Sequence, residues 1–196
     1  MESLPGMWRT ELWHPLSVHF PIALLIFATL FFVVARLVPF KWKEKFSTTG
    51  LFMLIPGAIL VWWAVYSGTL ADSVVGRYVC DPTVLEDHER FAYLTAYLFS
   101  GAAFLEIAVR LESLLKSAKL RRYLSVLSLV VLLAGSASMS YVGHLGAKLV
   151  YQQAAGVHQP SEDCAEFESG KHGRNNRVLH QLSGAGMRRR QNGVIQ

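Results

Sequence analysis

Charged residues are scarce in this chain. Lys, Arg, Asp and Glu make up 17% of the 196 residues, whereas 52% of the residues are hydrophobic. Ordinary soluble domains carry about 25% charged residues. The shortage of charge therefore excludes an ordinary soluble domain of this size and predicts a core that faces lipid.

Several functional motifs are also missing. The sequence contains no nucleophile motif, phosphate-binding loop or dinucleotide fingerprint. It has only two cysteines and no C-x-x-C-H run, which excludes covalent attachment of a c-type haem. These absences leave membrane roles that rest on side chains inside or beside the apolar segments.

Four apolar stretches are long enough, at about 20 residues or more, to cross a hydrocarbon core of roughly 30 Å as helices. They run from about residue 12 to 38, 49 to 70, 88 to 110 and 122 to 151. The first stretch lacks the basic leader and the cleavage site of a signal peptide, so we expect it to remain in the mature protein.

The expected fold class is all-α, an integral membrane four-helix bundle. It covers residues 1–158 and is followed by a polar, partly disordered C-terminal tail over residues 159–196. No sequence repeat is strong enough to suggest duplicated halves.

Charge in the connections predicts the orientation. Basic residues dominate the first and third connections and acidic residues dominate the second, namely Lys41, Lys43, Lys45, Lys116, Lys119, Arg121 and Arg122 against Asp72, Asp81, Glu86, Asp87 and Glu89. Short loops rich in Lys and Arg stay in the cytoplasm, so we expect an N-out and C-out protein, with both termini periplasmic in a bacterial inner membrane. The pI near 9.4 reflects these loops and the tail, so nucleic acid is not an expected partner.

This orientation places both cysteines on the oxidising side of the membrane. Cys80 lies in the acidic connection and Cys164 follows the fourth stretch. They form a candidate disulfide, and the alternative is two unrelated free thiols, because the sequence does not fix their distance.

Three histidines are expected at one height in the membrane. His14, His88 and His144 each lie 22 residues from an arginine that marks the opposite interface, about 33 Å along a helix. Those arginines are Arg36, Arg110 and Arg122. His19 lies about 7 Å deeper than His14 and about 140° around the helix from it. His14, beside Trp13, best fits an interfacial histidine that binds nothing.

Small side chains follow two of these histidines at helical spacing. They are Ala92, Ala96 and Ser100 below His88, and Ser140 and Ser136 below His144. A flat macrocycle held edge-on between helices needs such a slot next to imidazole ligands. Small residues also let membrane helices pack closely without any cofactor. Both interpretations of the stripes stay open at this point.

The run HPLSVHFPIALL, residues 14–25, closely resembles the opening of domain-of-unknown-function family 2231, a family of predicted four-helix bacterial membrane proteins. The resemblance continues in SGTLAD (67–72), at His88 and in GHLGAKLVY (143–151), and it covers about residues 10–158. Relatives of this kind occur fused or adjacent to cytochrome-like modules, which implies electron transfer with haem as the candidate cofactor. After the fourth stretch the sequence departs from the family pattern, so the resemblance assigns no role to His158.

We therefore expect a b-type haem-binding electron-transfer protein, with haem b near the external face. His88 and His144 are the first choice of ligand pair, since they lie at matching heights on neighbouring antiparallel helices. His19 is an alternative ligand for pairing with either, and Ser140 and Ala92 are expected beside the cofactor. The expected partners are the lipid bilayer, the quinone pool, an external redox protein and a homo- or hetero-oligomer.

Two other functions stay open. One is a cofactor-free accessory or scaffold subunit of a membrane redox complex, in which the small residues pack helices and the histidines only make hydrogen bonds. The other is a periplasm-facing copper or zinc handling protein, since imidazole suits both metals. In each case we expect an electron carrier or a subunit rather than a stand-alone enzyme.

Overall fold

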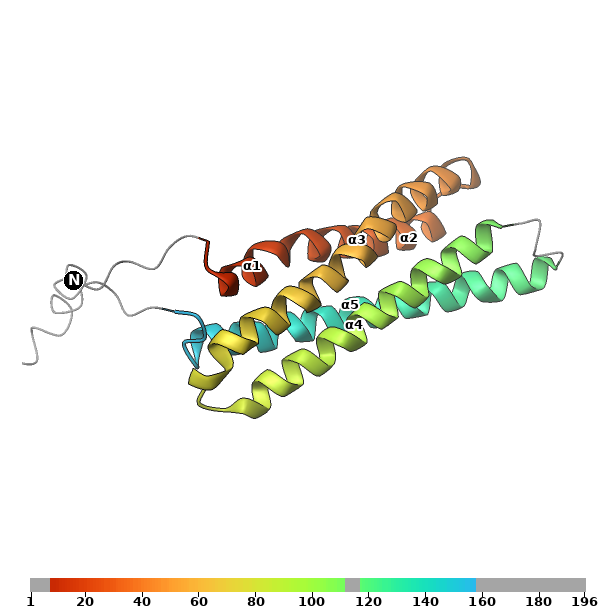
Figure 1. Cartoon of the computed structure of the whole chain (residues 1–196). Helices are drawn as coiled ribbons and strands as arrows, with labels where there is room; N and C mark the ends of the chain where they lie inside the picture. Colours follow the sequence, from red (N-terminus) through yellow and green to blue (C-terminus); the bar gives the residue numbers. More distant parts are fainter. Residues whose placement is uncertain (1–7, 112–116, 158–196) are drawn as a thin grey trace, which may run out of the picture. The chain divides into compact units, whose positions relative to one another are not determined.

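A computed structural model describes residues 8–111 and 117–157. Its elements are α1 (Thr10–Ser17), α2 (His19–Leu37), α3 (Phe40–Val75), the short 3-10 helix η1 (Gly76–Tyr78), α4 (Pro82–Arg110) and α5 (Ala118–Tyr151). Four helical segments are long and apolar enough to cross a membrane: Thr10–Leu37, Phe40–Tyr78, Pro82–Arg110 and Ala118–Tyr151 (Figure 1). The described residues include no strand. The expectation of an all-helical membrane protein is therefore confirmed.

The helices begin earlier than the apolar stretches indicate. α3 starts at Phe40, so the basic residues expected in the first connection lie on its opening turns. α4 starts at Pro82, where the Asp81 side chain caps the helix by accepting a hydrogen bond from the Thr83 amide at 3.0 Å. His88 consequently lies inside α4 rather than at its first residue.

The first membrane span is divided into α1 and α2. Proline has no amide proton, and its ring crowds the carbonyl four residues earlier. Pro21 therefore cannot donate to Ser17, where α1 ends, and α2 begins at His19.

The helices pair as two antiparallel hairpins, one made by α1, α2 and α3 and the other by α4 and α5 (Figure 1). Both hairpins start at the same end of the bundle, which we call the histidine end because it carries His14 and His88. We call the opposite end, with Arg36 and Arg110, the arginine end.

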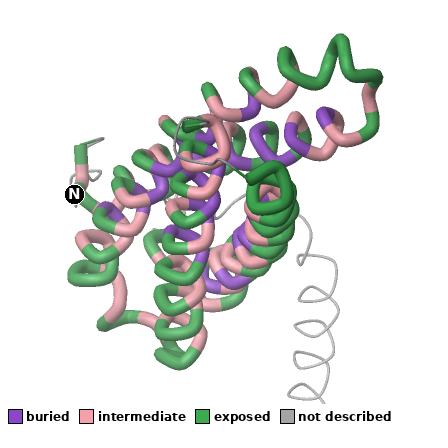
Figure 2. The backbone as a smooth tube through the Cα atoms, turned by 90° about the vertical axis from the view of Figure 1, so that its right-hand side faces the viewer, coloured by how far each residue is buried: buried purple, intermediate pink, exposed green. Residues whose placement is uncertain are grey.

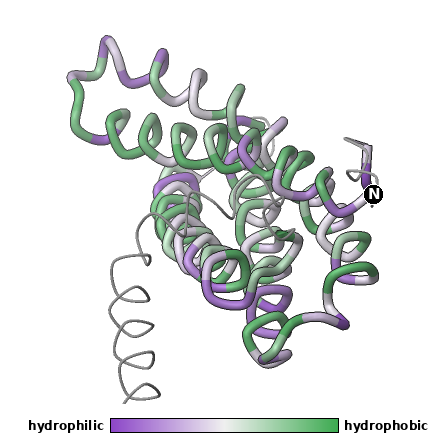
Figure 3. Tube along the Cα trace, turned by 90° about the vertical axis from the view of Figure 1, so that its left-hand side faces the viewer, coloured by the Kyte–Doolittle hydropathy of each residue, from purple (hydrophilic) through white to green (hydrophobic). Residues whose placement is uncertain are grey.

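The outer surface of the bundle is apolar. Buried residues lie on the helix faces that meet one another (Figure 2), while hydrophobic residues make up most of the length of the helices (Figure 3). Phe52 and Phe104 are 76% and 72% exposed, and many other large apolar side chains also point outward. An apolar surface of this extent is stable in contact with lipid rather than water.

The two hairpins repeat each other. Adding 74 to the residue numbers of most buried positions in α2 gives buried positions in α4. Adding 78 to those of most buried positions in α3 gives buried positions in α5. The buried pairs are Leu25 with Phe99, Ala28 with Ala102, Leu54 with Leu132, Gly57 with Gly135, and Val61 with Met139. The structure therefore reveals duplicated halves that the sequence repeat was too weak to suggest.

Contacts within each hairpin are repeated as well. A Cβ added to Gly57 would lie 2.7 Å from Leu25, and a Cβ added to Gly135 would lie 3.1 Å from Phe99. In both hairpins, the second helix thus presents a glycine to a large side chain of the first helix. The repeated glycine allows the same close approach of the two helices.

Contacts between the hairpins are reciprocal. Arg36 on α2 donates to the Ser125 carbonyl and hydroxyl on α5, and Arg110 on α4 donates to the Ser47 carbonyl and hydroxyl on α3. The same two shifts relate the arginines and the serines. A contact that is exchanged in this way is characteristic of a two-fold interface. The hairpins are therefore related by a pseudo-two-fold axis that runs along the bundle.

The glycine contact gives a stability prediction. We expect Gly57→Ala to destabilise the protein by about 1–3 kcal/mol, because the added Cβ would lie 2.7 Å from the completely buried Leu25 side chain, which would have to shift. Gly101→Ala is the matched control, since a Cβ there meets nothing within 4 Å and alanine favours a helix by about 0.5–1 kcal/mol. Thermal unfolding of the detergent-purified variants compares the two. Equal melting temperatures would contradict the tight packing at Gly57.

Candidate functional site

His14 and His88 form a pair between the two hairpins at the histidine end. Their ring centroids are 6.1 Å apart and the ring planes are perpendicular. His14 comes from α1 and His88 from α4, and the shift of 74 residues relates one to the other. Equivalent residues touch only near a two-fold axis, so this pair marks where the pseudo-two-fold axis passes.

The backbone of α3 orients the His14 ring. Its Nδ1 lies 3.0 Å from the Ala64 carbonyl oxygen and 3.3 Å from the Ser67 hydroxyl. A carbonyl oxygen can only accept, so Nδ1 carries a proton and donates it. In the neutral ring, Nε2 is then the atom with a free lone pair. The ring also lies against Gly68, where an added Cβ would be 3.1 Å from it.

His88 is held in the same way by α5. Its Nδ1 donates to the Val142 carbonyl at 3.1 Å, and a Cβ added to Gly146 would lie 3.3 Å from the ring. The shift of 78 residues carries Ala64 to Val142 and Gly68 to Gly146. Each imidazole thus bonds a carbonyl one turn before a glycine, and in the neutral ring this bond leaves Nε2 with the free lone pair. Such a bond fixes the tautomer and orientation of a metal-binding histidine.

The structure does not bring His144 to His88. Val142 and Gly146 contact the His88 ring from α5, and residue 144 lies about 200° around the helix from residue 142. His144 therefore points outward, where it is exposed and stacks on Tyr141 with centroids 6.5 Å apart. The structure therefore does not bring His88 and His144 together, and the histidine that lies beside His88 is His14.

The other expected site residues also lie apart from this pair. His19 is exposed on the first turn of α2, about 140° around from the face that carries His14. Ser140 is exposed and donates to the Ser136 carbonyl of its own helix at 2.9 Å. Ala92 is half-buried, one turn below His88 on α4.

The slot expected below His88 is filled by the protein's own side chains. The Thr95 and Ser138 hydroxyls bond each other at 2.7 Å between α4 and α5, and one turn deeper Phe99 packs on Gly135. Ser100 accepts a hydrogen bond from the Trp62 indole at 3.0 Å. These small residues therefore serve helix packing, and the histidine pair sits at the seam between hairpins instead.

The sequence does contain a signal that pairs His14 with His88. The 22-residue interval from His14 to Arg36 equals the interval from His88 to Arg110. The equal intervals can mean that the histidines lie at the same height in the membrane, or that the two segments are copies of one repeat. The second interpretation pairs His14 with His88. Because Trp13 lies beside His14, an aromatic belt was the simpler interpretation.

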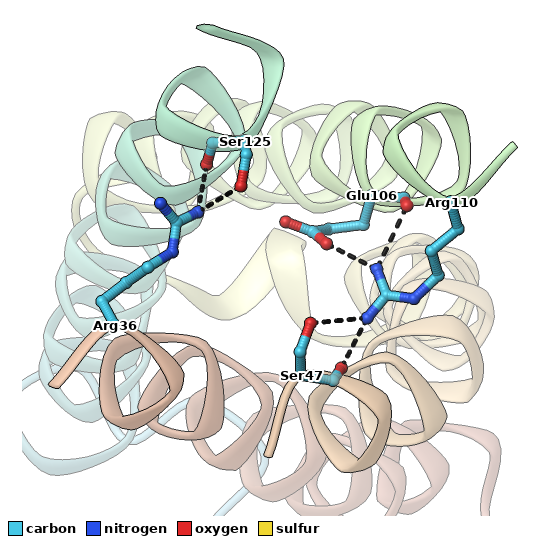
Figure 4. Close-up of polar contacts among 5 residues, drawn as sticks. All are labelled: Arg36, Ser47, Glu106, Arg110 and Ser125. Carbon is cyan, nitrogen blue, oxygen red and sulfur yellow. Dashed lines mark hydrogen bonds and ion pairs between the residues drawn. The ribbon is translucent and has the colours of Figure 1, made fainter. Parts of the chain in front are cut away.

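The arginine end holds a second polar cluster, which is drawn in Figure 4. The Arg110 guanidinium pairs with Glu106 at 2.7 Å and bonds both the carbonyl and the hydroxyl of Ser47 at 2.7 Å. Arg36 makes the equivalent bonds to Ser125 at 2.5 and 2.6 Å. The Glu106 side chain is only 4% exposed. The ion pair of Glu106 with Arg110 thus lies within α4 with its carboxylate buried, and the bonds from Arg110 to Ser47 connect α4 to α3.

An apolar layer separates the two ends. Leu25, Leu54, Phe99 and Leu132, one from each spanning segment, are completely buried between them. This layer excludes water from the middle of the bundle. The histidine pair and the arginine cluster are thus two independent polar sites.

Only one cysteine of the candidate disulfide lies among the described residues. Cys80 is exposed in the turn between η1 and α4. Cys164 lies outside the described residues, as does the tail from residue 158 onward. The Cys80–Cys164 bond stays a prediction.

Metal-ligating side chains are few around the histidine pair. The described part of the chain has no group of three or more His, Cys, Asp or Glu side chains placed to hold a metal ion. A metal centre at this pair has two protein imidazoles and must take its remaining ligands from elsewhere.

Comparison with known proteins gives one match. The family model described as "Predicted membrane protein (DUF2231)" matches residues 12–159. No curated protein and no solved structure matches the chain. The matched residues contain both hairpins and both histidines of the pair.

Proposed function

The chain belongs to the DUF2231 family of predicted membrane proteins, and we propose that it is a membrane electron carrier whose b-type haem is held by His14 and His88. The observation that carries the proposal is the histidine pair on the pseudo-two-fold axis. Iron in a b-type haem takes two neutral imidazoles from different helices, and the pair supplies one from each hairpin.

The separation of the rings supports this proposal. If the Nε2 atoms of both rings held one metal ion with bonds of about 2.0 Å, the ring centroids would lie about 6 Å apart. The observed centroid separation is 6.1 Å. The rings also lie against Gly68 and Gly146, where an added Cβ would be only 3.1 and 3.3 Å from them.

The number of donors favours haem over a bare ion. A structural zinc site uses four protein ligands and a catalytic one usually three. The tetrapyrrole supplies four nitrogens of its own, so haem needs only the two imidazoles that His14 and His88 provide. This is why we rank haem b above copper or zinc handling.

A bound haem would supply one-electron chemistry, and the protein's residues would fix its setting. The Ala64 and Val142 carbonyls hold the two Nδ1 protons and so aim each Nε2. The buried apolar layer below keeps water from entering the middle of the bundle.

The placement of the pair at one end, together with the expected orientation, indicates the side of the membrane on which electrons would be exchanged. With the basic connections in the cytoplasm, the histidine end and both termini face the periplasm of a bacterial inner membrane. Electrons would then pass between the quinone pool, or a membrane partner, and a redox protein on the external side.

The test is a dithionite-reduced minus oxidised absorption spectrum of the purified protein, expressed with adequate haem supply and followed by metal analysis. We expect a reduced b-type spectrum and one iron per chain. A featureless spectrum without bound metal would overturn the proposal in favour of a cofactor-free scaffold subunit. Bound copper or zinc without haem would overturn it in favour of a metal-handling protein.

A further inference from the structure

The two imidazoles differ in their second hydrogen-bond partner. Besides the Ala64 carbonyl, His14 has the Ser67 hydroxyl 3.3 Å from its Nδ1. Ser67 is 1% exposed, and its hydroxyl donates to the same Ala64 carbonyl at 3.0 Å. The Ser17 hydroxyl lies 3.2 Å from that of Ser67. His14 Nδ1 therefore sits against a small hydroxyl network as well as a carbonyl.

Comparison of the two hairpins shows that only His14 has this hydroxyl network. The shifts of 78 and 74 residues carry Ser67 to Leu145 and Ser17 to Phe91. Leu145 is 3% exposed, and Phe91 packs against Tyr141 with ring centroids 4.7 Å apart. Both equivalents are apolar, so the His88 Nδ1 bonds only the Val142 carbonyl among the described residues.

We propose that Ser67 is a positioning residue that makes His14 the more strongly donating of the two haem ligands. This inference rests on the proposed function. A second acceptor on the Nδ1 proton holds the ring more firmly and raises the basicity of Nε2. A more basic ligand stabilises the oxidised iron, so Ser67 lowers the reduction potential of the haem.

The repeat itself provides the test variant. Ser67→Leu gives His14 the apolar neighbour that His88 has, and Ser67→Thr keeps a hydroxyl at the same position. We expect the midpoint potential to rise in Ser67→Leu and to stay close to the wild-type value in Ser67→Thr. Ser140→Leu is the matched control, because Ser140 is exposed on α5 and bonds only its own helix. We expect this control to leave the potential unchanged.

A readout on the haem-free protein separates the two proposals. In histidine-selective ¹⁵N spectra of the apoprotein in detergent, we expect Ser67→Leu to shift the Nδ1–H proton of His14 upfield and to leave that of His88 in place. If the wild-type protein binds no haem, the proposed function fails, whether or not that proton shifts. If haem binds and Ser67→Leu changes neither the potential nor the His14 proton, this inference fails and the proposed function stands.

Discussion

His14→Ala and His88→Ala each lower the amount of bound haem by about tenfold or more, a loss of at least ~1.4 kcal/mol in binding free energy. This is the expected result if the two rings hold the haem. The pseudo-two-fold axis relates the two positions, and each ring lies against one carbonyl and one glycine of the facing helix. We therefore expect a large loss of haem from either variant.

Two other histidines serve as matched controls. His144 and His19 are at or near the same end of the bundle, but their side chains are exposed on outer helix faces. We expect His144→Ala and His19→Ala to retain the wild-type amount of haem. The measurement is Soret absorbance per unit of purified protein, with thermal unfolding to confirm that each variant is folded. Loss of haem in His144→Ala with retention in His14→Ala would exclude the ligand pair proposed here.

The membrane spans were predictable because hydropathy is a property of each residue and the bilayer fixes the length of a spanning helix. The ligand pair was not predictable by the same route. Distance along the chain gives the height of His88, His14 and His144 in the membrane, but not the direction in which each side chain points. That direction depends on which face of α5 meets α4, and the contacts of Val142 and Gly146 with His88 determine it.

The internal repeat was hidden for a related reason. Identity between the hairpins is concentrated at contact positions, such as His14 with His88, Arg36 with Arg110, and Gly68 with Gly146. Lipid-facing positions between them need only be apolar, so they have diverged. The shift also changes from 74 to 78 residues, because the second hairpin has four more residues between its arginine and its serine. An alignment of the two hairpins with a single shift therefore matches only one helix of each hairpin and misses the other.

The repeat also identifies where the second hairpin departs from the first at the arginine end. In the first hairpin, Phe32 packs on Gly50, whose added Cβ would lie 3.0 Å from the ring. In the second hairpin, Glu106 occupies the position of Phe32 and Ser128 that of Gly50. Glu106 and Ser128 are both buried. A carboxylate and a hydroxyl thus replace an apolar contact, and Arg110 is the cation that pairs with that carboxylate.

Arg110→Ala should therefore be far more destabilising than its symmetry equivalent, Arg36→Ala. Removal of Arg110 leaves the Glu106 carboxylate buried without its partner, and breaking a buried ion pair in this way costs about 3–5 kcal/mol. Arg36 makes the same two kinds of bond to a serine. We expect Arg36→Ala to cost about 1–3 kcal/mol, the range for leaving buried hydrogen-bond partners unmade. Unfolding titrations in mixed micelles measure both free energies.

A double variant that gives the second hairpin the apolar contact of the first tests whether the buried Glu106 carboxylate causes the large effect of Arg110→Ala. Glu106→Phe combined with Ser128→Gly places in α4 and α5 the pair that Phe32 and Gly50 form in the first hairpin. In that double variant no buried carboxylate remains, so Arg110→Ala should cost no more than Arg36→Ala costs in the wild-type protein. The difference between the two backgrounds is the coupling between Arg110 and the two replaced residues, Glu106 and Ser128. An Arg110→Ala cost that stays the same in both backgrounds would show that Arg110 acts through Ser47 alone.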